Sequence, residues 1–488
     1  MKKQSWWITG LVGMAVFGSV NLGWAAELKE QPEPLQKFVA EPNHAHAGIS
    51  FHGVDLDTGK TVGAYNENMS IVPASTMKIV TSAAALELLG KDYQFETRLL
   101  YDGTINKNGV LKGNLFIQGM GDPTLGSDGV KVDKNAFLKQ WLEAMRKAEI
   151  KKVDGNIIVL DGLFGYQGVP GKWLWEDFGT DYGAGTYGIS VYDNLYTLYL
   201  KSGSVGTLPV ILRTEPTVTG LKIKNQSKVA GKEETEPYVR GIPFSFDRIL
   251  HGDVLPNQEE YKMKSDIPDP GLFLAQHFLS YLTENGIQVQ GKATTERLTT
   301  ERPKAEKTLV ITKSVTLSEI VKVLMSRSDN HYAEHLYEFV KTEKKTTIAD
   351  FWKEKGFPVK ALVMRDGSGM SPQNALSAKF LTDLLVYMDR PEQADLHYKE
   401  LFPIAGQEGT VKLFLKGSPL EGKAFIKTGS FSGVQSYAGY VENNGKRYAF
   451  AIIVNNWNGT RNELRVKIAH LLVDLFASAS SLEVKKAA

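Results

Sequence analysis

Three short motifs of serine, lysine and asparagine could together perform nucleophilic catalysis. They are residues 75–78 (STMK), 328–330 (SDN) and 427–429 (KTG). A serine hydroxyl is a weak nucleophile until a nearby base takes its proton, and a lysine can be that base only if burial or a neighbouring cation lowers its pKa. Residues i and i+3 share one face of a helix, so Lys78 Nζ can reach Ser75 Oγ. The first motif therefore predicts an activated serine.

The second motif offers groups that handle a proton. The Ser328 hydroxyl can carry a proton toward a leaving amine, and the Asn330 amide can orient that transfer. Asn330 also has a side-chain oxygen that can hold the Lys78 ammonium group. We therefore expect residues 328–330 to lie in a turn between two helices, close to the serine and its lysine.

The third motif offers positive charge and hydrogen-bond donors. Lys427 could supply the cation that lowers the pKa of Lys78, and Lys427 with Thr428 could bind a free carboxylate on a substrate. The backbone N–H groups of Ser75 and Ser430 could form an oxyanion hole, helped by the positive end of the helix that begins at the serine.

Each motif alone also has an ordinary structural explanation. Ser75 could cap a helix while Lys78 points into solvent, Ser328 could be another cap, and Lys427 could be a charge on an edge strand. What favours catalysis is that all three motifs occur in order, each in the expected local structure.

A competing pattern begins directly after the second motif. Residues 331–335 (HYAEH) fit the HxxEH signature of zinc peptidases, in which two histidines hold the metal and the glutamate is the base. Helical periodicity instead predicts a buried stripe of Ala333, Leu336, Tyr337 and Val340. His331 and His335 would then face solvent on the opposite side. A catalytic zinc also needs a third ligand, and none stands out. We therefore predict no metal, with a zinc peptidase as the alternative.

Composition narrows the class of protein. The chain has 488 residues, 42% of them hydrophobic and 23% charged, which suits two or three globular domains. The net charge is +2 with no basic block, so nucleic acid is not an expected partner. The absence of cysteine excludes disulfides, a lipidated N-terminal cysteine and thiolate zinc sites.

The N-terminus has the pattern of a cleavable export signal, residues 1–25. Lys2 and Lys3 precede an apolar run over residues 6–20. Gly23 and Ala25 then place small residues at the −3 and −1 positions of a cleavage site. A retained membrane anchor is the alternative. No later segment reaches the roughly 18 uninterrupted apolar residues of a spanning helix. We expect an exported protein, soluble or peripherally associated with a membrane, with no transmembrane segment in the mature chain.

The remaining patterns indicate an α+β protein. A hairpin is expected at residues 49–65, followed by a helix that Gly90 ends. Residues 91–307 contain many short β-like runs, and residues 297–307 read as a return linker. Helices are then expected within residues 316–341 and 377–388, a hairpin at 434–457 across Asn444-Gly445, and a final helix at 463–479.

The three motifs are accompanied by further characteristic stretches. These are residues 119–126 (GMGDPTLG), 366–371 (DGSGMS), 403–410 (PIAGQEGT) and 424–441 (AFIKTGSFSGVQSYAGYV). Together they resemble the class C low-molecular-mass penicillin-binding proteins, a family of serine D-alanyl-D-alanine carboxypeptidases that also act as endopeptidases. The resemblance covers nearly all of the mature sequence. Its accessory motifs separate the family from β-lactamases and shorter penicillin-binding proteins.

The resemblance implies a discontinuous catalytic domain. Residues 27–90 and 308–488 would form a β-lactamase or transpeptidase-like domain, an antiparallel sheet with helices. Residues 91–307 would form one or two inserted, mostly β modules. It also implies no cofactor, a periplasmic location, peptidoglycan stem peptides ending in D-Ala-D-Ala as substrates, and β-lactams as inhibitors that acylate Ser75. A non-catalytic wall-binding protein with the same fold is a further alternative.

Two positions concern recognition of the substrate side chain. The family implies an acidic residue on an inserted module that binds the diamino acid of the stem peptide, and Asp161 occupies a suitable place at the end of a strand. An Asp-Gly turn explains Asp161 equally well. Many relatives also carry an arginine directly after the DGSGMS stretch, where this chain has Pro372. This departure puts recognition of a free diaminopimelate end in doubt, but it leaves the acylation chemistry unaffected.

Overall fold

The structure is a computed structural model that describes residues 28–300 and 304–477. The chain forms two compact units. Unit 1 contains the described residues up to Thr76, Lys360–Val363 and those from Ala375 onward, and unit 2 contains Met77–Val359 and Met364–Asn374. The boundary between the units falls inside the motif at residues 75–78.

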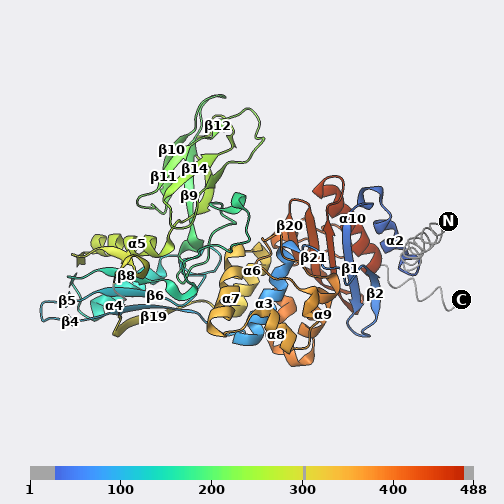
Figure 1. The fold of residues 1–488 in the computed structure, drawn as a ribbon, viewed down its shortest axis with the longest axis horizontal. Coiled ribbons are helices and arrows are strands. Elements are labelled where there is room, and N and C mark those ends of the chain that lie inside the picture. Colours follow the sequence, from blue (N-terminus) through green and yellow to red (C-terminus); the bar gives the residue numbers. More distant parts are fainter. Residues whose placement is uncertain (1–27, 301–303, 478–488) are drawn as a thin grey trace, which may run out of the picture. The chain divides into compact units, whose positions relative to one another are not determined.

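Unit 1 is built on a five-stranded antiparallel sheet (Figure 1). The strand order is β2-β1-β22-β21-β20, with bounds β1 Gly48–Asp55, β2 Thr61–Tyr65, β20 Ala424–Phe431, β21 Val434–Asn443 and β22 Lys446–Asn455. Both predicted hairpins are present, and the second turns at Asn444 and Gly445, which both have positive φ. β20, which carries residues 427–429, is an edge strand of this sheet.

Helices cover both faces of this sheet. They are α2 Glu33–Val39, α9 Ala378–Met388 and α10 Arg461–Phe476. Because side chains alternate along a strand, Phe51 of β1 joins the apolar core shared with α10, whereas its neighbour His52 bonds Thr382 of α9 on the opposite face. The predicted helices at residues 377–388 and 463–479 are confirmed over the described residues.

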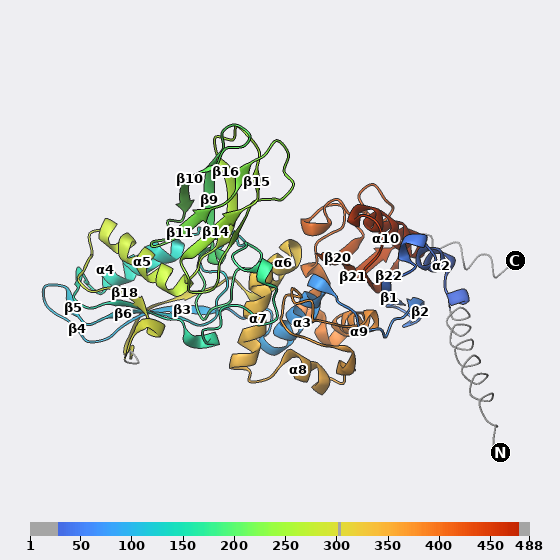
Figure 2. The same ribbon diagram turned by 45° about the horizontal axis from the view of Figure 1, so that its top comes forward.

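Part of unit 2 is helical (Figure 2). It contains α3 Met77–Leu89, α6 Leu317–Arg327, α7 Asn330–Glu343 and α8 Ile348–Glu354. α3 contacts the other three helices, and Trp352 of α8 donates a hydrogen bond to the carbonyl of Val80 at 3.2 Å. Gly90, with φ of +84°, follows the last residue of α3 as predicted.

The rest of unit 2 is rich in strands. One five-stranded sheet has the order β18-β8-β6-β3-β19, with β3 Glu96–Tyr101, β6 Leu115–Gly119, β8 Ile157–Leu160, β18 Ala293–Thr295 and β19 Lys307–Lys313. A four-stranded sheet has the order β17-β7-β5-β4, with β4 Thr104–Ile105, β5 Val110–Lys112, β7 Lys152–Val153 and β17 Gln288–Val289.

Residues 195–266 form three smaller sheets. Their orders are β10-β9-β16, β11-β14-β13 and β12-β15. The bounds are β9 Leu195–Lys201, β10 Val210–Glu215, β11 Lys222–Asn225, β12 Lys228–Val229, β13 Tyr238–Arg240, β14 Asp247–His251, β15 Asp253–Val254 and β16 Tyr261–Asp266.

Two helices lie within this strand-rich region, where we expected mostly β structure. They are α4 Ala136–Lys147 and α5 Pro270–Glu284, and α5 packs on β8 and β18 (Figure 2). The rings of Trp141 and Phe278 pack edge to face with their centroids 5.2 Å apart, and both helices belong to one apolar core. The helices thus supply the second layer that an amphipathic sheet needs.

Two predictions concern parts of the chain outside the described residues. The export signal at residues 1–25 lies there, as do residues 301–303 of the predicted return linker. Among the described residues, no helix is both long and apolar enough to cross a membrane.

Candidate active site

The structure places each of the three motifs in the local setting that the sequence predicts. Ser75 lies in the 3-10 turn Ala74–Thr76, which runs directly into α3. Ser328 and Asp329 connect α6 to α7, Asn330 is the first residue of α7, and residues 427–429 lie within β20. Ser75 and the third motif belong to unit 1, whereas Lys78 and the second motif belong to unit 2.

In unit 1, β20 runs very close to the backbone around Ser75. A Cβ atom at Gly429 would lie 2.8 Å from the Ser75 nitrogen and 2.7 Å from the Pro73 carbonyl oxygen. Only glycine fits such an approach without displacing one backbone from the other. The Ser75 N–H group therefore lies beside the strand segment that carries Gly429 and Ser430.

A hydroxyl of the neighbouring strand holds the same turn. Ser436 of β21 donates a hydrogen bond to the Pro73 carbonyl at 2.6 Å, and Thr76 Oγ1 donates to the same oxygen at 2.8 Å. Between them Ala74 has φ of +48°, a left-handed conformation that costs a non-glycine residue about 1–3 kcal/mol. These bonds help to hold the strained turn that presents the half-buried Ser75.

Lys427 and Thr428 occupy different environments on β20. Lys427 is fully buried, and its ammonium group donates to the carbonyl of Thr428. The Thr428 hydroxyl is half-buried and bonds the hydroxyl of Thr410, the last residue of the 403–410 stretch, at 2.9 Å. Ser430 is exposed. The strand therefore offers a buried cation followed by accessible hydrogen-bonding groups.

In unit 2, Lys78 is fully buried and held by two acceptors. Its Nζ donates to Asn330 Oδ1 at 2.6 Å and to the Ser368 carbonyl at 2.7 Å. Burial lowers the pKa of Lys78 to about 8, although the nearby carboxylates of Glu334, Asp366 and Asp329 act in the opposite direction. A lysine with this pKa can accept a proton near neutral pH.

The turn between α6 and α7 has an unusual backbone. Ser328 ends α6 in the left-handed region, with φ of +59° and ψ of +39°, and Asp329 caps α7 by accepting the Tyr332 N–H at 2.9 Å. The Asn330 amide nitrogen donates to the carbonyl of Tyr182 at 2.9 Å. Asn330 is therefore fixed on both sides, by Lys78 and by the segment around Tyr182.

The prediction that His331 and His335 face solvent is wrong. Both are buried, at 5% and 0% exposure, because residues of the strand-rich part of unit 2, including Phe164 and Ser190, pack on this side of α7. His335 Nδ1 donates to the His331 carbonyl and Nε2 accepts from the Ser190 hydroxyl, each at 2.8 Å. Phe164 meets the His335 ring edge-on, and burial lowers the pKa values of both histidines.

The geometry of this HxxEH pattern does not support a zinc site. Both ring nitrogens of His335 are engaged, and both carboxylate oxygens of Glu334 accept backbone N–H groups. Among the residues the structure describes, no group of three or more histidine, aspartate or glutamate side chains is arranged to hold a metal ion.

Glu334 and Ser368 were not predicted to contribute to a serine active site. Glu334 is fully buried and bonds the N–H groups of Gly367 and Ser368, and the carbonyl of Ser368 holds Lys78. Residues 366–371 were recognised as a motif, but the sequence does not show which side chain this loop contacts. A glutamate within the apolar pattern of a helix was the available signal, since a buried carboxylate requires hydrogen-bond partners.

Asp161 lies at the end of β8 and is 3% exposed. The Tyr166 hydroxyl donates to its Oδ1 at 3.4 Å, while burial and the carboxylates of Asp269 and Glu296 raise the pKa of Asp161 to about 7. Asp161 is thus a buried carboxyl with acidic neighbours, and its role in substrate binding stays a prediction.

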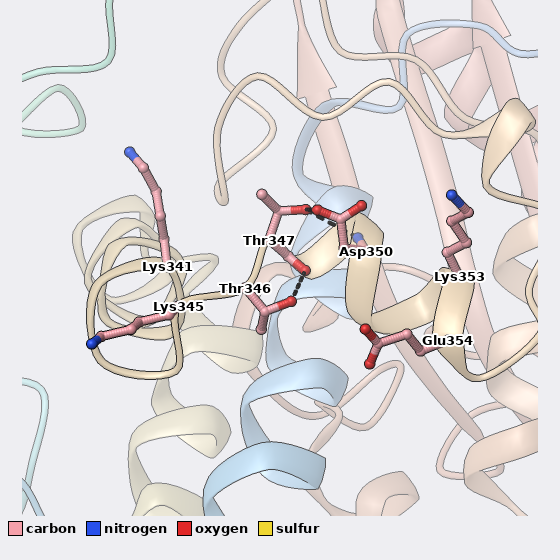
Figure 3. A pocket seen from close by; sticks show the side chains of 7 residues that line it. All are labelled: Lys341, Lys345, Thr346, Thr347, Asp350, Lys353 and Glu354. Atoms are coloured by element: carbon pink, nitrogen blue, oxygen red, sulfur yellow. Dashed lines mark hydrogen bonds between the residues drawn. The ribbon is translucent and has the colours of Figure 1, made fainter.

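A surface hollow lies between the end of α7 and the start of α8 (Figure 3). Lys341, Lys345 and Lys353 line it together with Thr347, which caps α8. Lys341 is eleven residues beyond Asn330 on α7, which is about 16 Å along a helix. This hollow is therefore remote from Lys78 and its partners.

Comparisons with known proteins identify the family. A profile described as the D-Ala-D-Ala carboxypeptidase 3 (S13) family matches residues 32–475. The D-alanyl-D-alanine carboxypeptidase DacB of Haemophilus influenzae is 26% identical over 447 residues, covering 87% of this chain and 89% of that protein. A D-alanyl-D-alanine carboxypeptidase of an Actinomadura species is 26% identical over 456 residues, covering 89% and 82%.

A solved structure shares the fold. The crystal structure of penicillin binding protein 4 from Haemophilus influenzae matches with a TM-score of 0.77 and 23% identity, covering 93% of this chain and 99% of that one. The same protein complexed with a β-lactam matches with a TM-score of 0.72. The predicted α+β fold class is confirmed. The extent of the profile match shows that this chain belongs to the D-Ala-D-Ala carboxypeptidase 3 (S13) family.

Proposed function

We propose that the protein is an exported serine D-Ala-D-Ala carboxypeptidase that trims peptidoglycan stem peptides through an acyl-enzyme. The observation that carries this proposal is Lys78, a fully buried lysine three residues after Ser75. Its pKa is lowered to about 8, and Asn330 of the second motif holds it. Family membership supports the same activity.

In the proposed acylation step, Ser75 is the nucleophile and Lys78 is the base. The neutral amine of Lys78 takes the hydroxyl proton as Ser75 Oγ attacks the carbonyl carbon between the two D-alanines. The N–H groups of Ser75 and Ser430 stabilise the oxyanion of the tetrahedral intermediate. The C–N bond then breaks, and the proton that Lys78 took passes by way of the Ser328 hydroxyl to the amine of the departing D-alanine, while the Asn330 amide orients the transfer.

Deacylation restores the free enzyme. Water attacks the Ser75 ester, its proton is taken by the same base, and the shortened peptide leaves with a new carboxylate. If the departing amine belongs to the side chain of a neighbouring stem peptide, the same steps cut a cross-link. The proposal therefore includes D,D-endopeptidase activity.

Substrate binding would rely on charge. We assign the terminal carboxylate of the substrate to Lys427 and Thr428, because a buried lysine followed by an accessible hydroxyl suits a carboxylate. Asp161 remains the proposed partner of a cationic side chain on the stem peptide. Its burial predicts that the segment around Tyr166 must move before such a ligand can reach it.

Several further points belong to the same proposal. β-Lactams, which a Haemophilus influenzae relative binds in a crystal, would acylate Ser75 and leave slowly. Residues 27–90 and 308–488 would form the catalytic domain and residues 91–307 the inserted modules. Residues 1–25 would direct export, which in a bacterium with two membranes leads to the periplasm.

Labelling with a fluorescent penicillin tests the proposal. The wild type should be labelled and should release D-alanine from a pentapeptide, and Ser75→Ala should lose both activities. EDTA should leave both unchanged. Loss of peptidase activity with EDTA but no labelling would indicate a zinc peptidase instead. Binding to peptidoglycan without labelling or turnover would indicate a wall-binding protein. Persistent labelling of Ser75→Ala would refute the assigned nucleophile.

A further inference from the structure

Glu334 has no role in the catalytic steps proposed for Ser75 and Lys78. It nevertheless bonds Ser368, the residue whose carbonyl accepts a hydrogen bond from Lys78. We propose that Glu334 is a positioning residue that fixes the loop 366–371 so that the Ser368 carbonyl holds Lys78 in place for catalysis. This inference rests on the proposed function, because it assigns Glu334 a task only if Lys78 is the base.

The hydrogen bonds form a short chain through a single residue. Glu334 Oε1 accepts the N–H of Ser368 at 2.7 Å, and Glu334 Oε2 accepts the N–H of Gly367 at 3.2 Å. The carbonyl of the same Ser368 accepts the Lys78 ammonium group at 2.7 Å. The orientation of Ser368 therefore links the carboxylate on α7 to the lysine on α3.

The loop is packed too closely on α7 to adjust easily. A Cβ atom at Gly367 would lie 2.7 Å from the Ala333 carbonyl oxygen and 2.5 Å from the Tyr337 Cβ. The Thr81 hydroxyl donates to the Gly367 carbonyl at 2.7 Å. Since the two N–H groups that face Glu334 are buried, they would be left without acceptors if the carboxylate were removed.

A second carboxylate shapes the loop but does not replace Glu334. Asp366 accepts the N–H groups of Gly369 at 2.8 Å and Ser371 at 2.6 Å, and also the indole N–H of Trp173 at 3.0 Å. These bonds close the loop on itself and on the segment around Trp173. The bonds of Glu334, by contrast, act on the residue that binds Lys78.

Glu334 also contributes charge. The titratable groups near it are Lys78, Asp366 and Tyr337, and Asp329 is a further group near Lys78. Burial and Asp366 raise the pKa of Glu334, whereas the two backbone donors favour its charged form. Its negative charge raises the pKa of Lys78, so loss of that charge should let Lys78 lose its proton at lower pH.

The test is the rate of acylation by a fluorescent penicillin, measured against pH in the full-length protein. Glu334→Gln keeps the shape of the side chain but turns one acceptor into a donor that faces a backbone N–H. We expect the maximal rate to fall about tenfold, the scale of losing one hydrogen bond to a charged group. The midpoint of the rising limb should move to lower pH.

Three matched variants separate positioning from general damage. Thr81→Val removes another bond to the loop without removing charge, so its rate should fall while its midpoint stays. Glu334→Asp keeps the charge on a shorter side chain and should behave in the same way, which also provides a test if Glu334→Gln does not fold. Glu338 lies one turn further along α7 and pairs with Lys341. Glu338→Gln should therefore change neither the maximal rate nor the midpoint of the pH profile.

Two outcomes would overturn the inference. One is a Glu334→Gln protein that acylates at the wild-type rate with the wild-type midpoint. The other is a rate that falls only in proportion to the folded fraction, measured by circular dichroism, with an unchanged midpoint. Failure of the wild type to acylate would instead refute the proposed function, so the two failures are distinguishable.

Discussion

The approach of β20 to Ser75, the proposed nucleophile, can be tested at Gly429. In Gly429→Ala, the added methyl group would lie 2.4 Å from Ser436 Oγ, 2.7 Å from the Pro73 carbonyl oxygen and 2.8 Å from the Ser75 nitrogen. The Ser436 hydroxyl can rotate away, but the other two atoms belong to the backbone. The strand or the turn that carries Ser75 must therefore move.

The size of the effect follows from these distances. Ordinary contacts of a methyl carbon begin near 3.5 Å, so the backbone around Ser75 must shift by about 0.7 Å or more. A misplacement of about 1 Å in an active site can cost about a hundredfold in rate. Overpacking of this kind lowers the free energy of unfolding by about 1–3 kcal/mol. We expect a folded protein whose acylation is slowed about a hundredfold.

The assay is the second-order rate of acylation by a fluorescent penicillin, with thermal unfolding measured on the same samples. Gly48→Ala is the matched control, because Gly48 begins β1 of the same sheet and an added Cβ would meet no atom closer than 3.8 Å. The control should acylate normally. Wild-type acylation by Gly429→Ala would refute this expectation, because it would show that the strand does not constrain Ser75.

Two further predictions concern Lys78 and His335. Because the pKa of Lys78 is lowered to about 8 from 10.5, the acylation rate should rise as pH rises through about 8, and Lys78→Met should acylate at a small fraction of the wild-type rate at every pH. Between pH 8 and 10.5, Lys78 has lost its proton in the folded protein but keeps it in the unfolded chain. The free energy of unfolding, measured with urea, should therefore increase as pH rises through this range. His335→Gln should lower the free energy of unfolding by about 1–3 kcal/mol through its two buried hydrogen bonds, while the folded fraction still acylates and remains indifferent to EDTA. A rate profile that is flat through pH 8, or a folded His335→Gln protein that cannot be acylated, would contradict these expectations.

The sequence predicted the local structure around each motif well, because that structure depends on nearby residues. A serine before an alanine-rich and leucine-rich run indicates a helix start, Gly90 indicates its end, and Asn444-Gly445 indicates a hairpin. The two helices within the strand-rich region were not predicted. α4 has apolar residues at helical spacing, but the short β-like runs on either side of it favour strands.

The burial of α7 could not be inferred from its own sequence. An apolar stripe indicates one buried face, and the opposite face is then expected in solvent. Here Phe164 and Ser190, more than a hundred residues earlier in the chain, pack on that opposite face at His335. The error at His331 and His335 thus has a tertiary cause, as does the missed role of Glu334, whose partners Gly367 and Ser368 follow more than thirty residues later.

The first two turns of α7 explain why two motifs of different enzyme classes overlap in one stretch. Asn330 and Glu334 are four residues apart and so lie on one face of the helix. Asn330 bonds Lys78 directly. Glu334 accepts the N–H of Ser368, and the carbonyl of Ser368 also bonds Lys78. His331 and His335 form the adjacent pair, with ring centroids 4.2 Å apart, and His335 bonds the Ser190 hydroxyl. The glutamate that would serve as a base beside a metal is here bound to backbone N–H groups, and the asparagine one turn before it bonds a lysine.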